Sequence, residues 1–257
     1  DHDLVIVAAG KGAIAQMFQR DASRSPYDKP QRALALTYVH GMAPRPEFSA
    51  VNFNLIPGVG EYFVFPALTV SGPCEIMVFE GVPGGPMDCW ADVATPAQHL
   101  SRSKEILAKF LPWEAARCTQ VELTDANGIL AGRFAPTVRQ PVGQLPSGRV
   151  VMGMADAVLL NDPITGQGSN NAAKFANAVE QAIVAHGDKA FELCTPVAGV
   201  FAHAHIARPE VEALMPVFTR LAESGPVHVD LGLFTARGQF RVVETTRKHG
   251  YSDQTLS

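Results

Sequence analysis

The stretch that most constrains the fold of this chain lies at residues 148–187, where a buried-strand pattern runs into a glycine-containing loop and a long helical pattern. Residues 150–154 are a short apolar run of the length expected for a buried strand. Asp156 follows that run, and the sequence Asp-Pro-Ile-Thr-Gly-Gln-Gly occupies residues 162–168. Apolar residues then recur at helical spacing up to a stop at Gly187. The sequence therefore predicts a strand, a loop and a helix in succession.

This order of residues suits a ligand at the start of the helix. Gly166 and Gly168 have no Cβ, so the backbone can approach a ligand closely there. The N–H groups around residues 168–171 have no partner within the helix and carry the positive end of its dipole. Asp156 can accept a hydrogen bond from a sugar or ribityl hydroxyl. Spacing alone leaves open the alternative of a plain strand-loop-helix connection with a helix cap.

The passage resembles the second flavin motif of FAD-dependent aromatic monooxygenases, and more closely that of the styrene and indole monooxygenases. The shared form is Val/Ile-x-Gly-x-x-Asp followed by Asp-Pro-x-x-Gly-Gln-Gly, which this chain carries at residues 151–168. Pro-Gln-Arg-Ala-Leu at residues 30–34 and Phe-Ala-Pro-Thr-Val-Arg at residues 134–139 also match. The resemblance extends from about Asp3 to Gly187 and identifies the chain as a member or fragment of this family.

The resemblance implies FAD as the cofactor. In the family, the motif Asp meets the ribityl–pyrophosphate region and the Gly-Gln-Gly-x-Asn turn lies along the isoalloxazine. The cofactor-binding residues that it implies here are Gly10, Asp156, Pro163, Gly166, Gln167, Gly168, Ser169, Asn170 and Asn171.

The resemblance also implies the reaction. In relatives, a flavin hydroperoxide transfers its distal oxygen to a small apolar aromatic or alkene substrate, and a separate NADH-dependent flavin reductase supplies the reduced FAD. Such chemistry needs no catalytic side-chain triad, and none is evident in the sequence. Two alternatives stay open: a single-component NAD(P)H-dependent aromatic hydroxylase, and a non-catalytic module that binds an apolar ligand without FAD.

The family's first flavin motif is missing. No G-x-G-x-x-G follows a first strand, although this loop cradles the ADP pyrophosphate. In the family it lies well upstream of the strand that begins here at Asp3. Residues 10–12, Gly-Lys-Gly, could seat a phosphate, but a plain strand-to-helix turn is the favoured interpretation. We therefore expect a truncated chain, or one without its nucleotide half, that binds FAD weakly by itself.

Residues 30–139 differ in pattern from the flanking segments. One amphipathic helix is predicted at residues 96–110. Short β-rich runs, separated by Gly, Pro or Asn, occupy residues 33–39, 50–56, 61–66, 75–79, 119–124 and 128–135. They predict an antiparallel sheet with a covering helix.

These patterns, together with the resemblance, define the expected fold class and domains. We expect an α/β (α+β) fold, the remnant of a Rossmann-like FAD-binding domain of the aromatic-hydroxylase type with an inserted antiparallel-sheet substrate-binding domain. The FAD-binding portion comprises residues 1–29 and 140–190, and the substrate-binding domain residues 30–139. Residues 191–257 carry no functional assignment. Within them, residues 227–243 predict a β-hairpin and residues 209–222 are compatible with a helix.

A dry pocket for the substrate is expected among the apolar residues of the sheet. The predicted pocket residues are Tyr62, Val64, Phe65 and Phe79. Because side chains alternate along a strand, Tyr62 and Val64 are expected on one face and Phe63 and Phe65 on the other. The nearby His99 is expected to be a surface or capping histidine.

Composition excludes several other classes. The hydrophobic fraction of 47% and charged fraction of 18% indicate an ordered globular chain. The net charge of −4 and the lack of a Lys/Arg run argue against nucleic acid. No apolar run approaches the ~18 residues of a membrane span, and no signal peptide is evident.

Four scattered cysteines favour reduced thiols and a cytoplasmic location. The pair His203 and His205 lacks further ligands, so no metal is expected. The oligomeric state is open, with a homodimer as one alternative.

Overall fold

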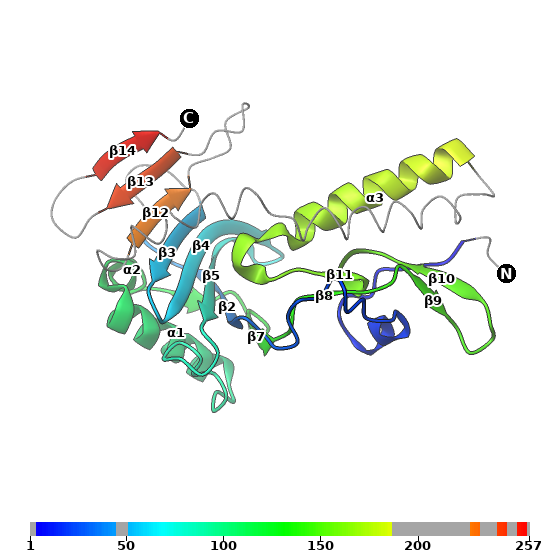
Figure 1. Cartoon of the computed structure of the whole chain (residues 1–257). Coiled ribbons are helices and arrows are strands. Elements are labelled where there is room, and N and C mark those ends of the chain that lie inside the picture. Colours follow the sequence, from blue (N-terminus) through cyan, green and yellow to red (C-terminus); the bar gives the residue numbers. More distant parts are fainter. Residues whose placement is uncertain (1–3, 45–50, 187–226, 232–240, 246–250, 256–257) are drawn as a thin grey trace. The chain divides into compact units, whose positions relative to one another are not determined.

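The computed structural model describes residues 4–44, 51–186, 227–231, 241–245 and 251–255 (Figure 1). The chain divides into two compact units. Unit 1 comprises residues 1–31 and 134–213, and unit 2 comprises residues 32–133 and 214–257. Each unit has its own hydrophobic core. The stop of the long helix at Gly187, the pair His203 and His205, and the helix considered at residues 209–222 lie outside the described residues.

The described part of unit 1 contains a small mixed sheet and one long helix. Its three-stranded sheet has the order β1-β10-β9, with β1 parallel to β10 and β9 antiparallel to it. A second pair, β8 and β11, is antiparallel. The strands are β1 (Ile6–Val7), β8 (Thr137–Val138), β9 (Val142–Gln144), β10 (Val150–Gly153) and β11 (Leu159–Leu160). The helices are η1 (Ala13–Met17), η2 (Ala155–Ala157), η3 (Pro163–Thr165) and α3 (Gln167–His186). The predicted strand at 150–154 and the helix after it are confirmed.

The core of unit 1 lies where α3 and η1 contact the sheet. Phe175 and Val179, four residues apart on α3, are both 2% exposed and share one face of the helix. Phe18, 1% exposed, follows η1 and belongs to the same core. An ideal Cβ on Gly153 would lie 2.3 Å from Cγ1 of Val158 and 2.9 Å from the Phe18 ring. The strand β10 therefore packs so closely on this core that only glycine fits at its end.

The described part of unit 2 contains one antiparallel sheet of nine strands. The order is β14-β13-β12-β3-β4-β5-β2-β6, and β7 also pairs with β2. The strands are β2 (Ala33–His40), β3 (Val51–Ile56), β4 (Gly60–Thr69), β5 (Gly72–Gly81), β6 (Glu122–Leu123), β7 (Ile129–Arg133), β12 (Val227–Leu231), β13 (Arg241–Thr245) and β14 (Tyr251–Thr255). The antiparallel sheet is confirmed, as is the antiparallel pairing of β12 with β13 that the sequence predicted. The fold is mixed α/β.

Two helices lie in the part of unit 2 that the structure describes, α1 (Pro96–Phe110) and α2 (Pro112–Arg117) (Figure 1). The sequence starts α1 with a complete capping box, in which the Thr95 side chain accepts from the Gln98 N–H and the Gln98 side chain accepts from the Thr95 N–H. Ile106 and Leu107 of α1 join the core formed with the sheet. The predicted helix is therefore confirmed at both ends.

His99 is not the surface or capping residue that the sequence suggested. It is 2% exposed, and its ring lies 4.6 Å from that of Trp90, centroid to centroid. Its Nε2 atom is buried without a hydrogen-bond partner. The expectation was wrong because His99 occupies the sheet-facing side of α1, where Ser103 donates to its carbonyl oxygen.

This burial predicts a pH dependence of unit 2. Burial lowers the pKa of His99 below its ordinary value of 6.5, an effect partly offset by a backbone hydrogen bond at Leu36. The folded state then binds this proton less tightly than the unfolded state. The free energy of unfolding of unit 2 therefore has its full value when the pH is above the pKa of the unfolded state. We expect it to decline as the pH falls below about 6.5 toward the pKa of the folded state.

The measurement is the urea midpoint followed by tryptophan fluorescence, since the two tryptophans, Trp90 and Trp113, both belong to unit 2. His99→Phe should flatten the midpoint's dependence on pH between about 5 and 8. His40→Gln serves as the control, because His40 is half-buried at the end of β2 and bonds the Pro73 carbonyl oxygen. An unaltered pH dependence in His99→Phe would contradict the assignment.

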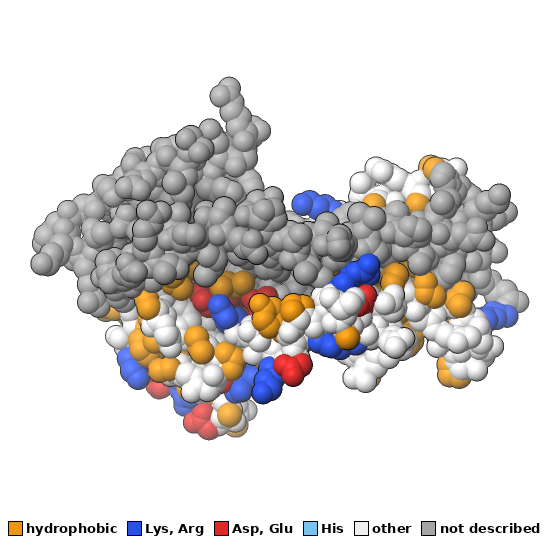
Figure 2. All heavy atoms as spheres, viewed as in Figure 1, with side chains coloured by type: hydrophobic (Ala, Val, Ile, Leu, Met, Phe, Trp, Pro, Cys, Tyr) orange, Lys and Arg blue, Asp and Glu red, His pale blue; other side chains and the backbone are white. Residues whose placement is uncertain are grey.

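On the face drawn in Figure 2, Lys and Arg side chains lie among acidic and hydrophobic ones and form no continuous basic patch. Within the described part of the chain, no helix has both the length and the apolar character required to cross a membrane.

Candidate functional site

The parallel strands β1 and β10 bring two predicted cofactor residues to one edge of a sheet. Ile6 pairs with Met152 and Val7 with Gly153, so both strands end on the same side. Gly10 follows β1, and Asp156 follows β10. Ligands of open α/β sheets bind beyond the carboxyl ends of the strands. Gly10, Asp156, Gly166 and residues 167–171, which begin α3, are called the strand-end site below.

Asp156 sits in a strained turn. The residue before it, Ala155, has φ of 55°, in the left-handed region that non-glycine residues rarely adopt. Strain of this kind costs on the order of 1 kcal/mol and often marks functional sites. Asp156 itself is half-buried within η2. Burial raises the pKa of its carboxyl, and the positive charge of Lys11 partly counteracts that effect. This carboxylate is therefore incompletely hydrated.

The Asp156 carboxylate faces the first turn of α3. An ideal Cβ on Gly168 would lie 3.9 Å from Oδ1 of Asp156, and the glycine has no other neighbour within 4 Å. Two predicted residues that are twelve positions apart thus come together. Asp162 shapes the intervening loop, because its side chain accepts from the Ile164 N–H at 3.0 Å. Gly166 ends η3 with φ of 59°.

The glycines in the described part of unit 1 fall into two kinds. At Gly10 and Gly166 an added Cβ would meet nothing within 4 Å, and at Gly168 it would meet only the Asp156 carboxylate. At Gly153 and Gly143 it would collide with the Phe18 ring, which lies 2.9 Å away in both cases. Packing of the chain itself therefore explains the second kind, whereas the first kind leaves open space around the strand-end site.

The first turn of α3 also holds a buried polar side chain. Asn171 is 4% exposed, and both its amide nitrogen and its amide oxygen are buried without a hydrogen-bond partner. Unpaired buried amides are uncommon, because each loses its bonds to water. Ser169 and Asn170 are exposed, and Pro163 is half-buried in η3. The side chain of Gln167 is not described.

The predicted substrate-pocket residues divide between the two faces of the sheet. Tyr62, Val64 and Phe79 are at most 1% exposed and belong to the core that includes α1. The Phe79 ring lies 5.0 Å from that of Tyr62 and 5.5 Å from that of Trp90. Phe65 is half-buried and has the opposite orientation on β4, as the alternation of side chains requires. The structure thus brings three of the four residues together.

The sheet face that carries Phe65 also holds a partly buried ion pair that the sequence did not reveal. Nε and Nη2 of Arg32 lie 2.7 and 3.0 Å from the two carboxylate oxygens of Glu61. Glu61 is paired across the strands with Glu80, and both are at most 5% exposed. The only sequence signal was the match at residues 30–34. The partners are 29 residues apart, so no local pattern connects them.

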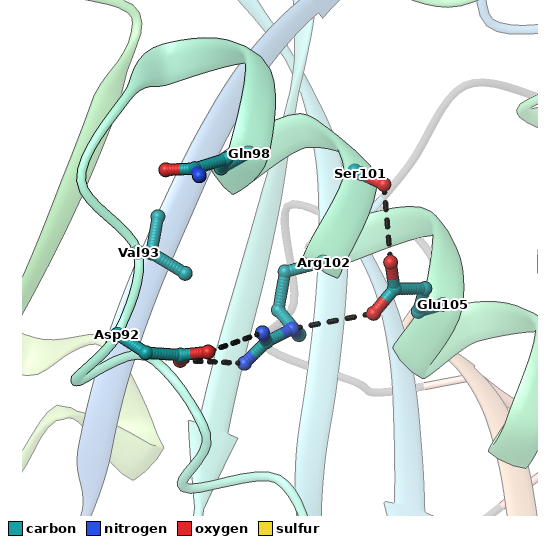
Figure 3. Close-up of a pocket in the computed structure, with 6 residues that line it drawn as sticks. All are labelled: Asp92, Val93, Gln98, Ser101, Arg102 and Glu105. Carbon is teal, nitrogen blue, oxygen red and sulfur yellow. Dashed lines mark hydrogen bonds and ion pairs between the residues drawn. The ribbon is translucent and has the colours of Figure 1, made fainter.

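A small pocket on unit 2 is lined by side chains that pair with one another, which indicates a structural role. It has a volume of about 120 Å³ and is lined by Asp92, Val93, Gln98, Ser101, Arg102 and Glu105. Figure 3 shows Arg102 between the carboxylates of Asp92 and Glu105, which it contacts at 3.0 and 3.3 Å. Arg102 also donates to the carbonyl oxygen of Cys89. The arginine therefore fastens the loop before α1 to the helix, and its charge is already paired.

Among the described residues, no cluster of three or more His, Cys, Asp or Glu side chains could hold a metal ion.

Comparisons with known proteins point to one family. The family model "Styrene monooxygenase A putative substrate binding domain" matches residues 10–117. The chain is 32% identical over 191 residues to the styrene monooxygenase StyA of Pseudomonas fluorescens and equally to that of a Pseudomonas species. Each alignment covers 72% of this chain and 46% of the relative, so the chain spans about half the length of these relatives. The crystal structure of PqsL, a probable FAD-dependent monooxygenase from Pseudomonas aeruginosa, has a TM-score of 0.48 at 16% identity, over 84% of this chain and 59% of PqsL.

Proposed function

Since the chain belongs to the styrene monooxygenase-like flavoprotein family, we propose that it forms part of an FAD-dependent monooxygenase acting on a small apolar aromatic or alkene substrate. Residues 1–29 and 140–190 supply part of the FAD site, and residues 30–139 form the substrate-binding domain. The observation that carries this proposal is the approach of Asp156 to Gly168 at the start of α3.

The residues of the strand-end site fit FAD. The cofactor has hydroxyl groups that a carboxylate such as Asp156 can bind, and carbonyl groups that suit the N–H groups at the start of α3. Gly166 and Gly168 leave the space that a flat ring system needs near the backbone. The unpaired amide of Asn171 offers one further donor and acceptor. When bound, FAD supplies the activation of molecular oxygen, while these residues bind and orient it.

The partners follow from the same proposal. The cofactor enters in reduced form from a separate NADH-dependent flavin reductase, and the substrate occupies an apolar pocket of unit 2 on the sheet face of Tyr62, Val64 and Phe79. Substrate oxidation that requires an added reductase would support this arrangement. Oxidation of NAD(P)H by the chain alone would favour the single-component hydroxylase instead.

Replacing Gly168 with Val tests the cofactor assignment. The side chain would enter the space beside Asp156, so we expect FAD affinity to fall at least tenfold, or about 1.4 kcal/mol. The measurement is a fluorescence titration of the chain with oxidised and with anaerobically reduced FAD. The matched control is Gly132→Val, because an added Cβ on Gly132 of β7 would meet nothing within 4 Å and this residue belongs to unit 2.

Gly166→Val is a second test of the cofactor assignment, and Gly148→Val is its control for backbone strain. Gly166 has φ of 59° and Gly148 has φ of 81°, and neither has a neighbour within 4 Å. Val is strained at both positions, but Gly148 precedes β10, whereas the strand-end site follows it. FAD affinity should fall in Gly166→Val and persist in Gly148→Val. Equal FAD affinity in the wild type, Gly166→Val and Gly168→Val would remove the cofactor assignment.

A further inference from the structure

Two arginines of unit 1 lie directly opposite each other in a short antiparallel bridge. Arg20 pairs with Arg139, and the residues that flank them close the bridge with backbone hydrogen bonds of 2.9 and 2.7 Å, one on each side. Because these bonds join the flanking residues and not the arginines, this is the narrow kind of antiparallel pair, in which opposite side chains lie closest. The two side chains therefore leave the backbone next to each other, on one face of the bridge.

This bridge places like charges opposite each other. Charges of the same sign destabilise a pair of strands when they face each other directly. Arginine keeps its positive charge in folded proteins, so the bridge carries two. Burial lowers the pKa of Arg139, and the positive charge of Arg20 lowers it further. An anion bound between the two guanidinium groups would remove this repulsion.

Neither guanidinium group has a carboxylate partner within the described part of the chain. The ion pairs there include neither Arg20 nor Arg139. Nη2 of Arg20 donates to the carbonyl oxygens of Ser25 and Tyr27, at 2.9 and 2.8 Å, which fixes the side chain and leaves Nε and Nη1 as donors. Arg139 is half-buried, and its Nη1 atom is buried without a hydrogen-bond partner. Such an atom has lost its bonds to water and gained none in return.

The acidic side chain nearest in sequence is already occupied. Asp21 follows Arg20, and Gln140 follows Arg139, so the alternation of side chains places both on the opposite face of the bridge. Their side chains bond there, since Nε2 of Gln140 lies 3.2 Å from Oδ2 of Asp21. Arg24 contacts the same oxygen at 3.2 Å. One face of the bridge thus has a neutralised acid, whereas the other has two arginines and no acid.

We propose that the guanidinium groups of Arg20 and Arg139 together bind a phosphate or diphosphate group. Phosphate oxygens accept the forked N–H donors of guanidinium in charge-assisted hydrogen bonds. A phosphate dianion balances both positive charges, whereas a carboxylate balances only one. The inference goes beyond the proposed function, because it requires neither FAD nor the strand-end site.

Calorimetric titration of the chain with inorganic pyrophosphate tests the site. The wild type should bind one pyrophosphate saturably, and Arg139→Gln should weaken this binding about tenfold or more. Arg139→Lys keeps the charge but not the forked donors, so its affinity should lie between the two. The control is Arg24→Gln, which removes an equal charge from the opposite face and should change the affinity less than about twofold. Absence of saturable binding, or equal affinity in the wild type and Arg139→Gln, would overturn the inference.

Hydrogen exchange shows whether the variant keeps its fold. Without pyrophosphate, peptides from β8 and β11 should exchange no faster in Arg139→Gln than in the wild type, because the substitution removes a repulsion. Pyrophosphate should slow their exchange in the wild type and not in the variant. Faster exchange in the ligand-free variant would show that the guanidinium group stabilises the fold by itself, and the inference would then be wrong.

Two flavins identify the source of the phosphate. FAD and riboflavin share the isoalloxazine ring, but riboflavin has no phosphate. If the diphosphate of FAD is the ligand, Arg139→Gln should weaken FAD binding about tenfold and leave riboflavin binding unchanged. Loss of pyrophosphate binding with unaltered FAD affinity would confirm the site and assign it to a free phosphate or another nucleotide. Pyrophosphate binding by a chain that binds no flavin would refute the proposed function and leave this inference standing.

Discussion

Replacing Gly153 with Ala is expected to destabilise unit 1 by about 3 kcal/mol. The new Cβ would lie 2.3 Å from Cγ1 of Val158 and 2.9 Å from the Phe18 ring, well inside van der Waals contact. Val158 and Phe18 are 3% and 1% exposed, so neither can move aside without disturbing the core. The glycine of the Gly-x-x-Asp motif is therefore required for packing, whatever its role toward a cofactor.

Hydrogen exchange measured by mass spectrometry would report this loss. Peptides from β10 and α3 should exchange more than about a hundredfold faster in Gly153→Ala, which corresponds to about 3 kcal/mol. Tryptophan fluorescence, which reports unit 2, should stay unchanged.

The matched control is Gly168→Ala. Its Cβ would have only the Asp156 carboxylate nearby, at 3.9 Å, and Ala is favoured over Gly within a helix by up to about 1 kcal/mol. This variant should therefore keep unit 1 at least as stable as the wild type. Wild-type exchange in Gly153→Ala would show that β10 can shift and that the packing argument is wrong.

Replacing Phe79 with Ala should cost unit 2 about 4 kcal/mol. The side chain is fully buried between the rings of Tyr62 and Trp90, so its removal leaves a cavity in the core beneath α1. The urea midpoint followed by tryptophan fluorescence measures the loss directly, because Trp90 lies 5.5 Å from Phe79.

Phe65→Ala is the control for this variant. Phe65 is half-buried on the other face of the sheet, and its removal should cost about 1–2 kcal/mol. The two variants also separate the roles of the predicted pocket residues. A Phe79→Ala protein as stable as Phe65→Ala would contradict the assignment of Phe79 to the core and favour a place in a pocket.

Local patterns in the sequence anticipated most elements of the fold. The amphipathic pattern of residues 96–110 predicted the helix α1, because apolar side chains at helical spacing gather on the one face that packs against the sheet. Alternation along residues 61–65 assigned side chains to the two faces, because successive side chains of a strand point in opposite directions. Grouping Phe65 with Tyr62 into one pocket ignored that same rule. The burial of His99 was missed because one histidine has no periodicity of its own.

The sequence by itself determined the types of most elements, the antiparallel sheet predicted for residues 30–139 and the motif that identifies the family. These depend on neighbours within a few positions, where spacing, caps and turn residues act directly. Only the tertiary structure decided which glycines of unit 1 pack against Phe18 and which face open space. It also decided that Asp156 meets Gly168 and that Lys11 rests on Phe134. The physical reason is that such contacts join residues distant in sequence, whose separation is set by how strands and helices pack and not by any local preference.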